Sequence, residues 1–546
     1  MPVVQLDKRY LYSLLGSGFD EKSLKDHVAK LGFEIEEADE GSLSLEVTAN
    51  RPDLLCALGL ARALKNFMHK TKKFNYAIED VEPALEIYVD PSVKRIRPYV
   101  AGVVAKGIKL ADDSLADVIT FTEKFCDTYG RSRRKVAIGM HDLDAIKPPV
   151  EYRCEKDVEY VPLGGTKKAR LSEVLAASPK GIQYSGIIAK GGKKFFPVIE
   201  DSQGVASFVP ILNSQRTRVT PSTTSIFVDI TGTSEYAVNK AAEILGAMFM
   251  DLGAKVGRVA IKYGRRTVQT PEMKTSYMSV PLARAEREIG VPIGFDNVIS
   301  LANKMGYEAA LVGKMVRFSI PQYRVDVIDR QDLIEDIAIG YGYEYINPIA
   351  APYTQSGGLE QQTLINRKAT GIMVGMGFSE FTNSYLTNEE TNFDKAGVKR
   401  EESIVVLQNP KTAEISMMRT WLLPSLLRNL GASSHDSMPQ DVFELDMVFC
   451  VQGSKPVESY HLGAASVGPK ANFNDMKAVV EGLLLSMGTQ YAVAEFRHDS
   501  FIEGRCAQIK MAGKHAGFFG ELHPKVLRNF GIEEPAVAME IDISAR

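Results

Sequence analysis

The sequence GFDNVISLANKMGYEAALVGKMVRFSIPQYRVDVIDRQDLIEDIAIG, residues 294–340, has the same order of predicted elements as residues 18–64. Each segment begins with Gly-Phe-Asp, continues with the apolar period of a helix, and then alternates as paired strands do. A turn that contains an aspartate, Asp53 or Asp326, precedes a second apolar helix. A shared order of elements with small differences in length is typical of duplication, so we predict two helix–hairpin–helix units.

The second of these units carries acidic residues that the first unit lacks. Asp332, Glu335 and Asp336 are spaced i, i+3 and i+4, so a helix places them on one face, where like charges repel. The first unit has no acid at the corresponding positions, which are Gly59, Arg62 and Ala63. We therefore infer that the unit folds without acids there. Carboxylates on a short arc suit Mg²⁺, whereas acids in a first helical turn complement the helix dipole, and spacing alone leaves both interpretations open.

Length and composition limit the class of protein. A chain of 546 residues is too long for a single core and fits roughly three or four domains. The 65 basic and 68 acidic residues nearly balance, so any RNA contact must come from local basic runs such as RSRRK at 131–135. Scattered cysteines without a CxxC pair favour reduced thiols over disulfides or structural zinc. The sequence shows neither a signal-like N-terminus nor an 18-residue apolar run, which predicts a cytoplasmic protein.

We predict an α+β multidomain chain made of four segments, residues 1–84, 85–268, 269–348 and 355–546. The first and third segments hold the two helix–hairpin–helix units. The second has strands separated by Gly and Pro turns and one helix with Ser234 as its N-cap, a mixed α/β pattern. The fourth interleaves helices with strands such as ESIVVL at 402–407 and AVAMEIDI at 536–543.

Three motifs, in this order, resemble those of a known family. They are VTANRPDLLCALGLARAL (47–64), RVDVIDRQDLIEDIAIGYGY (324–343), and LQNPKTAEISMMRTWLLPSLLRNL (407–430) followed by VFELDMVF (442–449). The sequence resembles, over essentially its whole length, the beta subunit of phenylalanyl-tRNA synthetase of the archaeal and eukaryotic kind.

The resemblance implies a metal, a partner and a substrate. The family's acidic motif binds magnesium, which carries over to Asp326, Asp332, Glu335 and Asp336, with Asp329 left as the helix start. The family's beta subunit pairs with an alpha subunit in an (αβ)₂ heterotetramer. The alpha subunit joins phenylalanine to tRNA with ATP as co-substrate. The whole assembly is therefore expected to be a phenylalanine–tRNA ligase.

The resemblance also assigns roles to the second and fourth segments. Residues 85–268 resemble an editing domain that hydrolyses tyrosine wrongly attached to tRNA, and we expect PILNSQRTRVTPSTTSIFVDITGTSEYA (210–237) to line its site. Asp229 and Thr231 are the candidate editing residues. The alternative is that they only shape a turn. The resemblance implies that the fourth segment is a class II synthetase fold that has lost its chemistry. The sequence agrees, because no ATP-binding arginine motif is visible, and Arg419 is expected to serve packing or an interface.

Two other functions remain open at this level. A non-enzymatic RNA-binding scaffold would share the same fold and differ in lacking a catalytic partner. A free-standing editing hydrolase would act without one. A stoichiometric alpha partner would separate the ligase from both alternatives.

Overall fold

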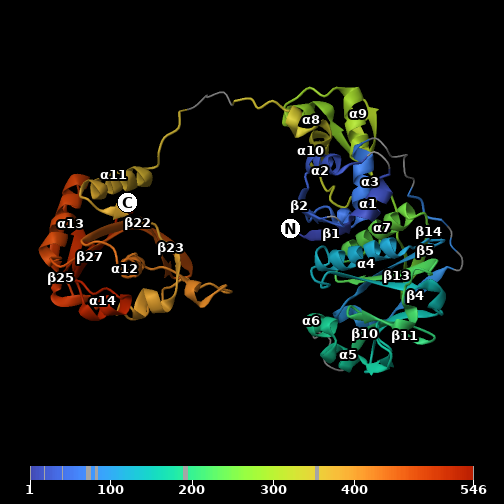
Figure 1. Cartoon of the computed structure of the whole chain (residues 1–546), viewed down its shortest axis with the longest axis horizontal. Coiled ribbons are helices and arrows are strands. Elements are labelled where there is room, and N and C mark those ends of the chain that lie inside the picture. Colours follow the sequence, from blue (N-terminus) through green and yellow to red (C-terminus); the bar gives the residue numbers. More distant parts are fainter. Residues whose placement is uncertain are drawn as a thin grey trace. The chain divides into compact units, whose positions relative to one another are not determined.

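The computed structural model describes residues 2–16, 19–39, 41–68, 76–79, 81, 84–188, 195–350 and 356–544. The chain forms two compact units, Met1–Ala350 and Ala351–Arg546, each with its own helices and sheets (Figure 1). This is the mixed α+β multidomain architecture expected from the sequence. Among the described residues, no helix is both long and apolar enough to cross a membrane.

The first repeat, residues 3–67, is a small antiparallel sheet packed with helices. Its elements are β1 (Val3–Asp7), α1 (Lys8–Leu15), α2 (Glu21–Lys30), β2 (Glu34–Ala38), β3 (Ser42–Glu46), the 3-10 helix η1 (Pro52–Leu54) and α3 (Ala57–Phe67). The strands lie in the order β1-β3-β2. Asp20 of the Gly-Phe-Asp start caps α2, since it accepts the backbone N–H of Ser23 at 2.7 Å. Gly32, with φ of 85°, lets the chain leave α2 through a left-handed turn.

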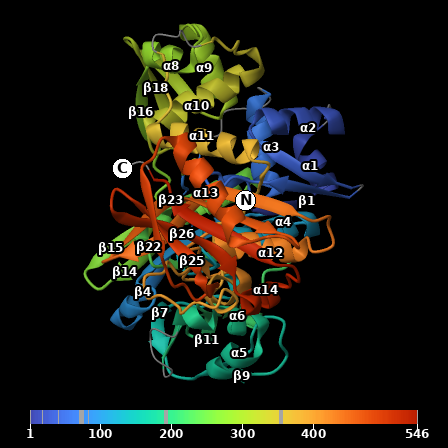
Figure 2. The ribbon, with the colours of Figure 1, turned by 90° about the vertical axis from the view of Figure 1, so that its left-hand side faces the viewer.

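The second repeat, residues 276–341, has the same order of elements. They are β16 (Ser276–Pro281), α8 (Leu282–Ile289), α9 (Phe295–Lys304), β17 (Glu308–Val312), β18 (Met315–Ile320) and α10 (Arg330–Tyr341), and η6 (Tyr343–Tyr345) follows. The strand order β16-β18-β17 matches that of the first repeat, and α8, α9 and α10 lie beside the sheet (Figure 2). Gly306, with φ of 84°, occupies the place of Gly32. A strand and a helix precede each Gly-Phe-Asp start, which the sequence pattern did not predict.

Between the repeats lies a ten-stranded sheet with its helices. The strands of this region are β4 (Leu85–Val89), β5 (Tyr99–Lys106), β6 (Val136–Asp142), β7 (Val150–Glu155), β10 (Phe196–Asp201), β11 (Gly204–Phe208), β12 (Leu212–Asn213), β13 (Ser225–Gly232), β14 (Lys255–Tyr263) and β15 (Arg266–Thr270), with a separate pair β8 (Glu159–Tyr160) and β9 (Ala169–Arg170). The α-helices are α4 (Asp112–Asp127), α5 (Leu171–Ala177), α6 (Pro179–Ile188) and α7 (Glu235–Asp251), and the 3-10 helices are η2 (Pro91–Arg95), η3 (Leu143–Ala145) and η5 (Gln215–Thr217). The predicted N-cap of α7 is confirmed, because the Ser234 side chain accepts the N–H of Ala237.

The two faces of strand β13 have different surroundings. It pairs antiparallel with both β5 and β6, so all of its backbone groups lie inside the sheet. Ile226, Val228 and Ile230 belong to the core that includes the apolar residues of α7. Because successive side chains of a strand point to opposite faces, Asp229 and Thr231 lie on the other face.

The C-terminal unit is a seven-stranded sheet with helices on both faces. Its α-helices are α11 (Gln361–Gly375), α12 (Leu423–Ala432), α13 (Phe473–Met487) and α14 (Pro524–Phe530), and its short helical turns are η7 (Glu390–Asp394) and η8 (Ala413–Ile415). Its strands are β19 (Ser379–Glu380), β20 (Leu386–Thr387), β21 (Met417–Met418), β22 (Gln440–Gln452), β23 (Lys455–Val467), β24 (Tyr491–Glu495), β25 (Phe501–Met511), β26 (Lys514–Leu522) and β27 (Ala536–Asp542). The sheet order is β19-β22-β23-β27-β26-β25-β24, and β20 and β21 form a separate pair.

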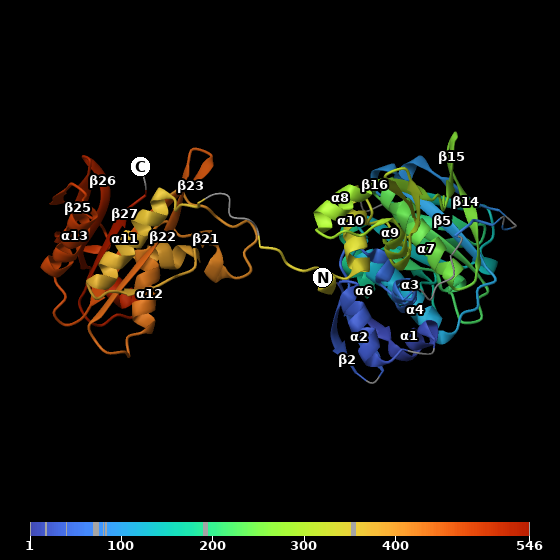
Figure 3. The same cartoon turned by 90° about the horizontal axis from the view of Figure 1, so that it is seen from above.

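Apolar side chains that alternate along the strands of this sheet form two cores, one on each face. Val442 and Ala465 pack with α12 and α14, whereas their neighbours Phe443 and Ala464 pack with α11 and α13. Figure 3 shows α11, α12 and α13 beside these strands. The period of two that the sequence shows in this segment therefore serves burial on both faces of the sheet.

One predicted strand of this unit is wrong. Residues 402–407 form no strand, and Val406 makes only an isolated bridge to Met417. The backbone bonds of this segment are divided between two neighbours. The carbonyl of Ser403 accepts from Val451, and the N–H of Leu407 donates to Ser416. Its β-branched residues favour a strand, but no single partner offers it a continuous ladder.

Candidate functional site

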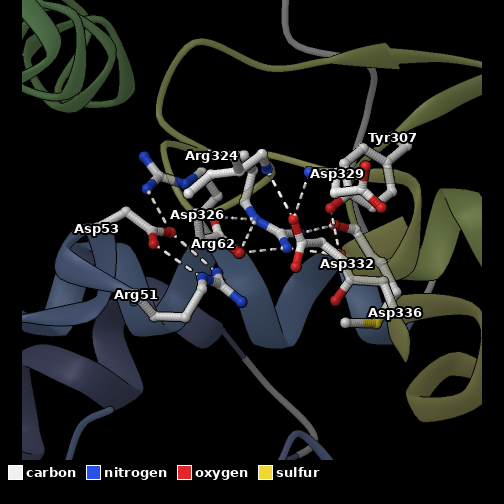
Figure 4. A network of polar contacts seen from close by, with 11 residues as sticks. Arg51, Asp53, Arg62, Tyr307, Arg324, Asp326, Asp329, Asp332 and Asp336 are labelled. Carbon is white, nitrogen blue, oxygen red and sulfur yellow. Dashed lines mark hydrogen bonds and ion pairs between the residues drawn. The ribbon is translucent and has the colours of Figure 1, made fainter. Parts of the chain in front are cut away.

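Each repeat holds a buried arginine–aspartate pair at the turn before its last helix. In the first repeat, Arg51 donates from Nε and Nη2 to the two carboxylate oxygens of Asp53, both at 2.9 Å. In the second repeat, Arg324 donates from Nε to Asp326 at 2.9 Å and from Nη2 at 2.7 Å. Such two-point pairs fix the planes of both side chains (Figure 4). The turn aspartates that the sequence aligned are thus bound in the same way.

The last helix of each repeat supplies a third charge, with opposite sign in the two copies. Arg62 on α3 donates to Asp53 at 3.4 Å, so the first repeat has two arginines around one aspartate. Asp336 on α10 accepts from Arg324 at 2.5 Å, so the second repeat has two aspartates around one arginine. Burial alone would lower the pKa of Arg324, but Asp336, Tyr307 and Asp326 outweigh it and raise that pKa well above its usual value.

The four predicted magnesium ligands lie near one another, but their side chains have different bonding partners. Asp326 and Asp336 both bind Arg324, and Asp336 also accepts the hydroxyl of Tyr307. Asp332 accepts the backbone N–H groups of residues 328 and 329 at 2.7 and 2.8 Å and so forms a capping box with Asp329 at the start of α10. Glu335 is exposed.

In this arrangement an ion that uses Asp326 or Asp336 has to displace Arg324. Arg324 lies between Asp326 and Asp336 and supplies the positive charge that an ion would supply. The part of the chain that the structure describes contains no group of three or more His, Cys, Asp or Glu side chains that could hold a metal. Asp329 begins the helix, as expected, because its side chain accepts the N–H of Gln331.

Arg62 also joins three parts of the first compact unit. Its guanidinium carbon lies 3.8 Å from the ring centre of Tyr323 in the second repeat. Its Nη1 donates to Asp251, at the end of α7, at 2.6 Å, and Asp251 also accepts the hydroxyl of Tyr76 at 2.9 Å. One side chain therefore links the two repeats to the helix that covers β13.

A second candidate site lies in the central region, where a cavity of about 440 Å³ surrounds the editing candidates. It is lined by residues of α4, β6, β11, β12 and β13, and both Asp229 and Thr231 belong to its wall. The predicted stretch 210–237 contributes several other wall residues between Pro210 and Val219. Asp229 and Thr231 are 2% and 1% exposed, so they form a deep part of the wall.

Asp229 is held by a buried histidine that lies 88 positions away in the sequence. His141 on β6 lies 2.7 Å from Asp229 Oδ2 through Nε2 and 2.8 Å from the Thr217 hydroxyl through Nδ1. An imidazole that donates Nε2–H to Asp229 leaves Nδ1 to accept from Thr217. Gly139 on β6 makes room for this carboxylate, because a Cβ there would lie 2.3 Å from Asp229 Oδ2. His141 is fully buried, and its role is polar.

Thr231 is held by a buried arginine. Arg97 is fully buried, donates from Nε to the Thr231 hydroxyl at 3.3 Å, and donates from Nη2 to the Thr231 carbonyl at 2.5 Å. Because Thr231 Oγ1 accepts this bond, its own hydrogen can be donated to a ligand. Burial lowers the pKa of Arg97. Neither Arg97 nor His141 had a sequence signal, because each meets its partner across the sheet.

In the C-terminal unit, Arg419 has the packing role that was expected. Its side chain is fully buried, donates to Glu444 at 2.6 Å and to the carbonyl of Met447 at 3.0 Å, and lies 3.5 Å from Asp446. The guanidinium is thus turned inward onto β22.

Family models match four parts of the chain. The Phe-tRNA synthetase beta subunit B1 domain matches residues 1–70, the B3/4 domain 122–249, the tRNA synthetase B5 domain 278–343, and the phenylalanyl tRNA synthetase beta chain CLM domain 348–543.

Relatives and a solved structure agree with these models. The phenylalanine–tRNA ligase beta subunit of Archaeoglobus fulgidus is 36% identical, with 100% of this chain and 98% of the relative covered. That of Methanococcoides burtonii is 33% identical, with 100% of both covered. The crystal structure of an N-terminal fragment of the phenylalanyl-tRNA synthetase beta subunit from Pyrococcus horikoshii has 32% identity and a TM-score of 0.60. It covers 63% of this chain and 100% of that fragment.

The two repeats, the sheet between them and these matches define a subunit of an aminoacyl-tRNA synthetase. More specifically, the chain belongs to the phenylalanine–tRNA ligase beta subunit family. It is therefore part of a ligase that attaches phenylalanine to tRNA.

Proposed function

We propose that the cavity on β13 hydrolyses tyrosine from mischarged tRNA, as an editing site of the ligase. The observation that carries this proposal is the buried carboxylate of Asp229, held by His141 at 2.7 Å in the wall of an otherwise largely apolar cavity. A cavity of about 440 Å³ is large enough for an aromatic amino acid together with part of the ribose that carries it.

The polar groups explain how such a site distinguishes tyrosine from phenylalanine. Asp229 accepts the phenolic O–H of tyrosine, and the hydroxyl of Thr231 donates to a ligand oxygen or to the attacking water. A phenylalanyl group offers no O–H, so it leaves a buried carboxylate without that partner, which costs binding free energy. In the reaction, water adds its oxygen to the acyl carbon and the bond to the ribose oxygen breaks. One proton goes to the ribose oxygen, and tyrosine is released.

The test is deacylation of tyrosyl-tRNA by the assembled ligase. We expect Asp229→Asn and Thr231→Val to lower the rate at least 10-fold, in the range that loss of a single catalytic or orienting hydrogen bond produces. Asp90→Asn is a matched control, because Asp90 is exposed and caps η2 outside the cavity. Deacylation at the wild-type rate in both site variants would assign Asp229 and Thr231 to shaping the turn.

We also propose that phenylalanine activation takes place on a separate alpha chain in an (αβ)₂ heterotetramer, with ATP and Mg²⁺. The inward position of Arg419 supports this proposal, because a buried guanidinium paired with Glu444 is not available to a nucleotide. The four segments 1–84, 85–268, 269–348 and 355–546 are the domains we propose, the last being a class II synthetase-like domain without catalysis. Phenylalanine-dependent pyrophosphate exchange by this chain alone would contradict the proposal.

The magnesium site at Asp326, Asp332, Glu335 and Asp336 is proposed with one condition. An ion can use Asp326 or Asp336 only if Arg324 releases that carboxylate, whereas Glu335 is accessible as it stands. We expect Glu335→Gln to change the unfolding free energy of the isolated chain by less than about 0.5 kcal/mol and to lower the magnesium dependence of the assembled ligase. Unchanged magnesium dependence would leave Arg324 as the cation of this motif.

A further inference from the structure

Three consecutive residues after α4 adopt a left-handed backbone although none is glycine. Arg131, Ser132 and Arg133 have φ of 52°, 50° and 63°. L-residues visit this region singly and rarely in succession. Backbone bonds hold the turn, for example from the N–H of Arg133 to the carbonyl of Cys126 at 2.9 Å. Arg97 holds it from the inside, since its Nη1 donates to the carbonyl of Arg133 at 2.7 Å. A strained turn held so firmly points to a function for the side chain that it places.

Arg133 lies in the wall of the β13 cavity with one donor unused. Its Nη1 donates to the carbonyls of Pro210 and Ile211 at 2.9 and 3.1 Å, and its guanidinium lies 4.6 Å from the ring centre of Tyr184. Its side chain is 12% exposed, and its Nε is buried without a hydrogen-bond partner among the described residues. A buried cationic N–H without an acceptor is unfavourable until a ligand supplies one.

A second cation lies beside Arg133. Lys180 on α6 pairs with Glu123 Oε1, and the same oxygen lies 3.9 Å from Arg133 Nη2. The two cations share one carboxylate, so this part of the wall has a net positive charge. Lys180 also lines an adjoining cavity of about 570 Å³, which shares Leu163, Gly164 and Leu212 with the first. The space available thus exceeds that of a single amino acid.

We propose that Arg133 and Lys180 bind a phosphate of the terminal nucleotide of tRNA while the attached tyrosine contacts Asp229 and Thr231. This inference rests on the editing function proposed above. At neutral pH an aminoacylated nucleotide carries an ammonium group and a phenolic O–H at one end and a phosphate at the other. Those groups match the carboxylate of Asp229 and the cations of Arg133 and Lys180. A neutral ester carbonyl would not use the net positive charge, whereas a phosphate does.

The direct test is binding of a stable substrate analogue to the full-length chain. The probe is 3′-tyrosylamino-3′-deoxyadenosine, in which an amide replaces the ester, with or without a 5′-phosphate. By calorimetry we expect the wild-type chain to bind the phosphorylated form about 10-fold tighter, and Arg133→Met to bind both forms alike. Arg131→Met is the matched control, because Arg131 belongs to the same left-handed turn but is exposed, and it should keep the difference. Equal binding of the two forms by the wild-type chain overturns the proposal.

Kinetics of the assembled ligase separate binding from folding. With tyrosyl-tRNA, we expect Arg133→Met to raise KM about 10-fold while kcat changes less than about threefold, and Arg133→Lys to recover part of the loss because it keeps the charge. An unchanged KM in Arg133→Met overturns the phosphate contact while the editing function stands. A wild-type ligase that does not deacylate tyrosyl-tRNA overturns the editing function instead, and the binding experiment still decides on the phosphate contact.

Discussion

The two repeats contain the same arginine–aspartate pair but surround it with opposite charge. The first repeat adds the cation Arg62 to its pair, and the second adds the anion Asp336. The charged groups of the two repeats interact electrostatically. Burial would raise the pKa of Asp53, but Arg51, Arg62 and also Arg324 of the other repeat lower it. The comparison teaches that the shared turn requires the pair, and that the third charge is adjusted to the opposing copy.

The helices after the two turns also obtain their N-terminal acids from different places. At the start of α10, Asp329 is the N-cap, and Asp332 of the same repeat completes the capping box by accepting the N–H groups of residues 328 and 329. Helix α3 is capped by Asp117 of α4, which accepts the N–H groups of Ala57 and Leu58 at 2.8 and 3.1 Å. The first repeat has no acid at Gly59, Arg62 or Ala63, and the acid at the start of α3 comes from a neighbouring segment.

The largest expected effect comes from removing the arginine of each arginine–aspartate pair, Arg324 or Arg51. Arg324→Met leaves Asp326 and Asp336 buried together without a cation, which should destabilise the chain by about 3–5 kcal/mol. Arg51→Met leaves Asp53 with Arg62, so its cost should be clearly smaller, about 1–2 kcal/mol. Denaturant unfolding of the full-length chain, followed through the transition of the first compact unit, measures both. Equal costs would show that the third charge has no part in stability.

A smaller effect on stability is expected from Asp117, the residue of α4 that accepts hydrogen bonds from the start of α3. Burial raises the pKa of Asp117 to about 6 from its ordinary 3.8, although the two N–H bonds oppose the shift. The folded chain therefore binds this proton more tightly than the unfolded chain, and the contribution to stability falls as pH rises from about 4 to 6. The change is on the order of 3 kcal/mol.

Asp117→Asn should remove that slope, as measured from unfolding free energies at several pH values in this window. Asp332→Asn serves as the comparison in the second repeat and should leave the slope in place, since the raised carboxyl remains. A slope that survives Asp117→Asn would assign the pH dependence to another group.

The smallest effect concerns the contact between the repeats. Arg62 lies over the ring of Tyr323, and this contact should contribute about 0.5–2 kcal/mol. A double-mutant cycle with Arg62→Met and Tyr323→Leu isolates it from the bonds that Arg62 makes to Asp53 and Asp251. A coupling free energy near zero would mean that the ring only fills space beside the guanidinium.

Periodicity and turn residues predicted much of the fold. The helices α2 and α9 at the two Gly-Phe-Asp motifs, the Ser234 cap and the alternation in β27 each depend on neighbours in sequence, and each is present in the structure. Asp229 and Thr231 could be placed on one face of a strand for the same reason. The strand predicted at 402–407 is wrong because strand propensity depends on the residues of the segment itself, whereas its backbone hydrogen bonds depend on distant segments.

What sequence reasoning missed depends on contacts between distant segments. Arg51 and Arg324 stand inside the motifs that resemble the family, two residues before their aspartates, but the spacing of like charges on α10 does not indicate that an arginine opposes them. His141 reaches Asp229 through the pairing of β6 with β13, Arg97 reaches Thr231 from the segment before β5, and Asp117 reaches α3 from α4. No local pattern reports such distances.

The opposite charge of the two trios has a consequence for how such a chain can arise by duplication. Two identical copies of the first repeat would bring two positive trios together, and two copies of the second would bring two negative ones. Only one positive trio together with one negative trio gives a net charge of zero where the repeats meet at Tyr323. The copies are thus no longer interchangeable modules. Exchanging the order of the two repeats preserves this charge match, whereas replacing either repeat with a copy of the other loses it.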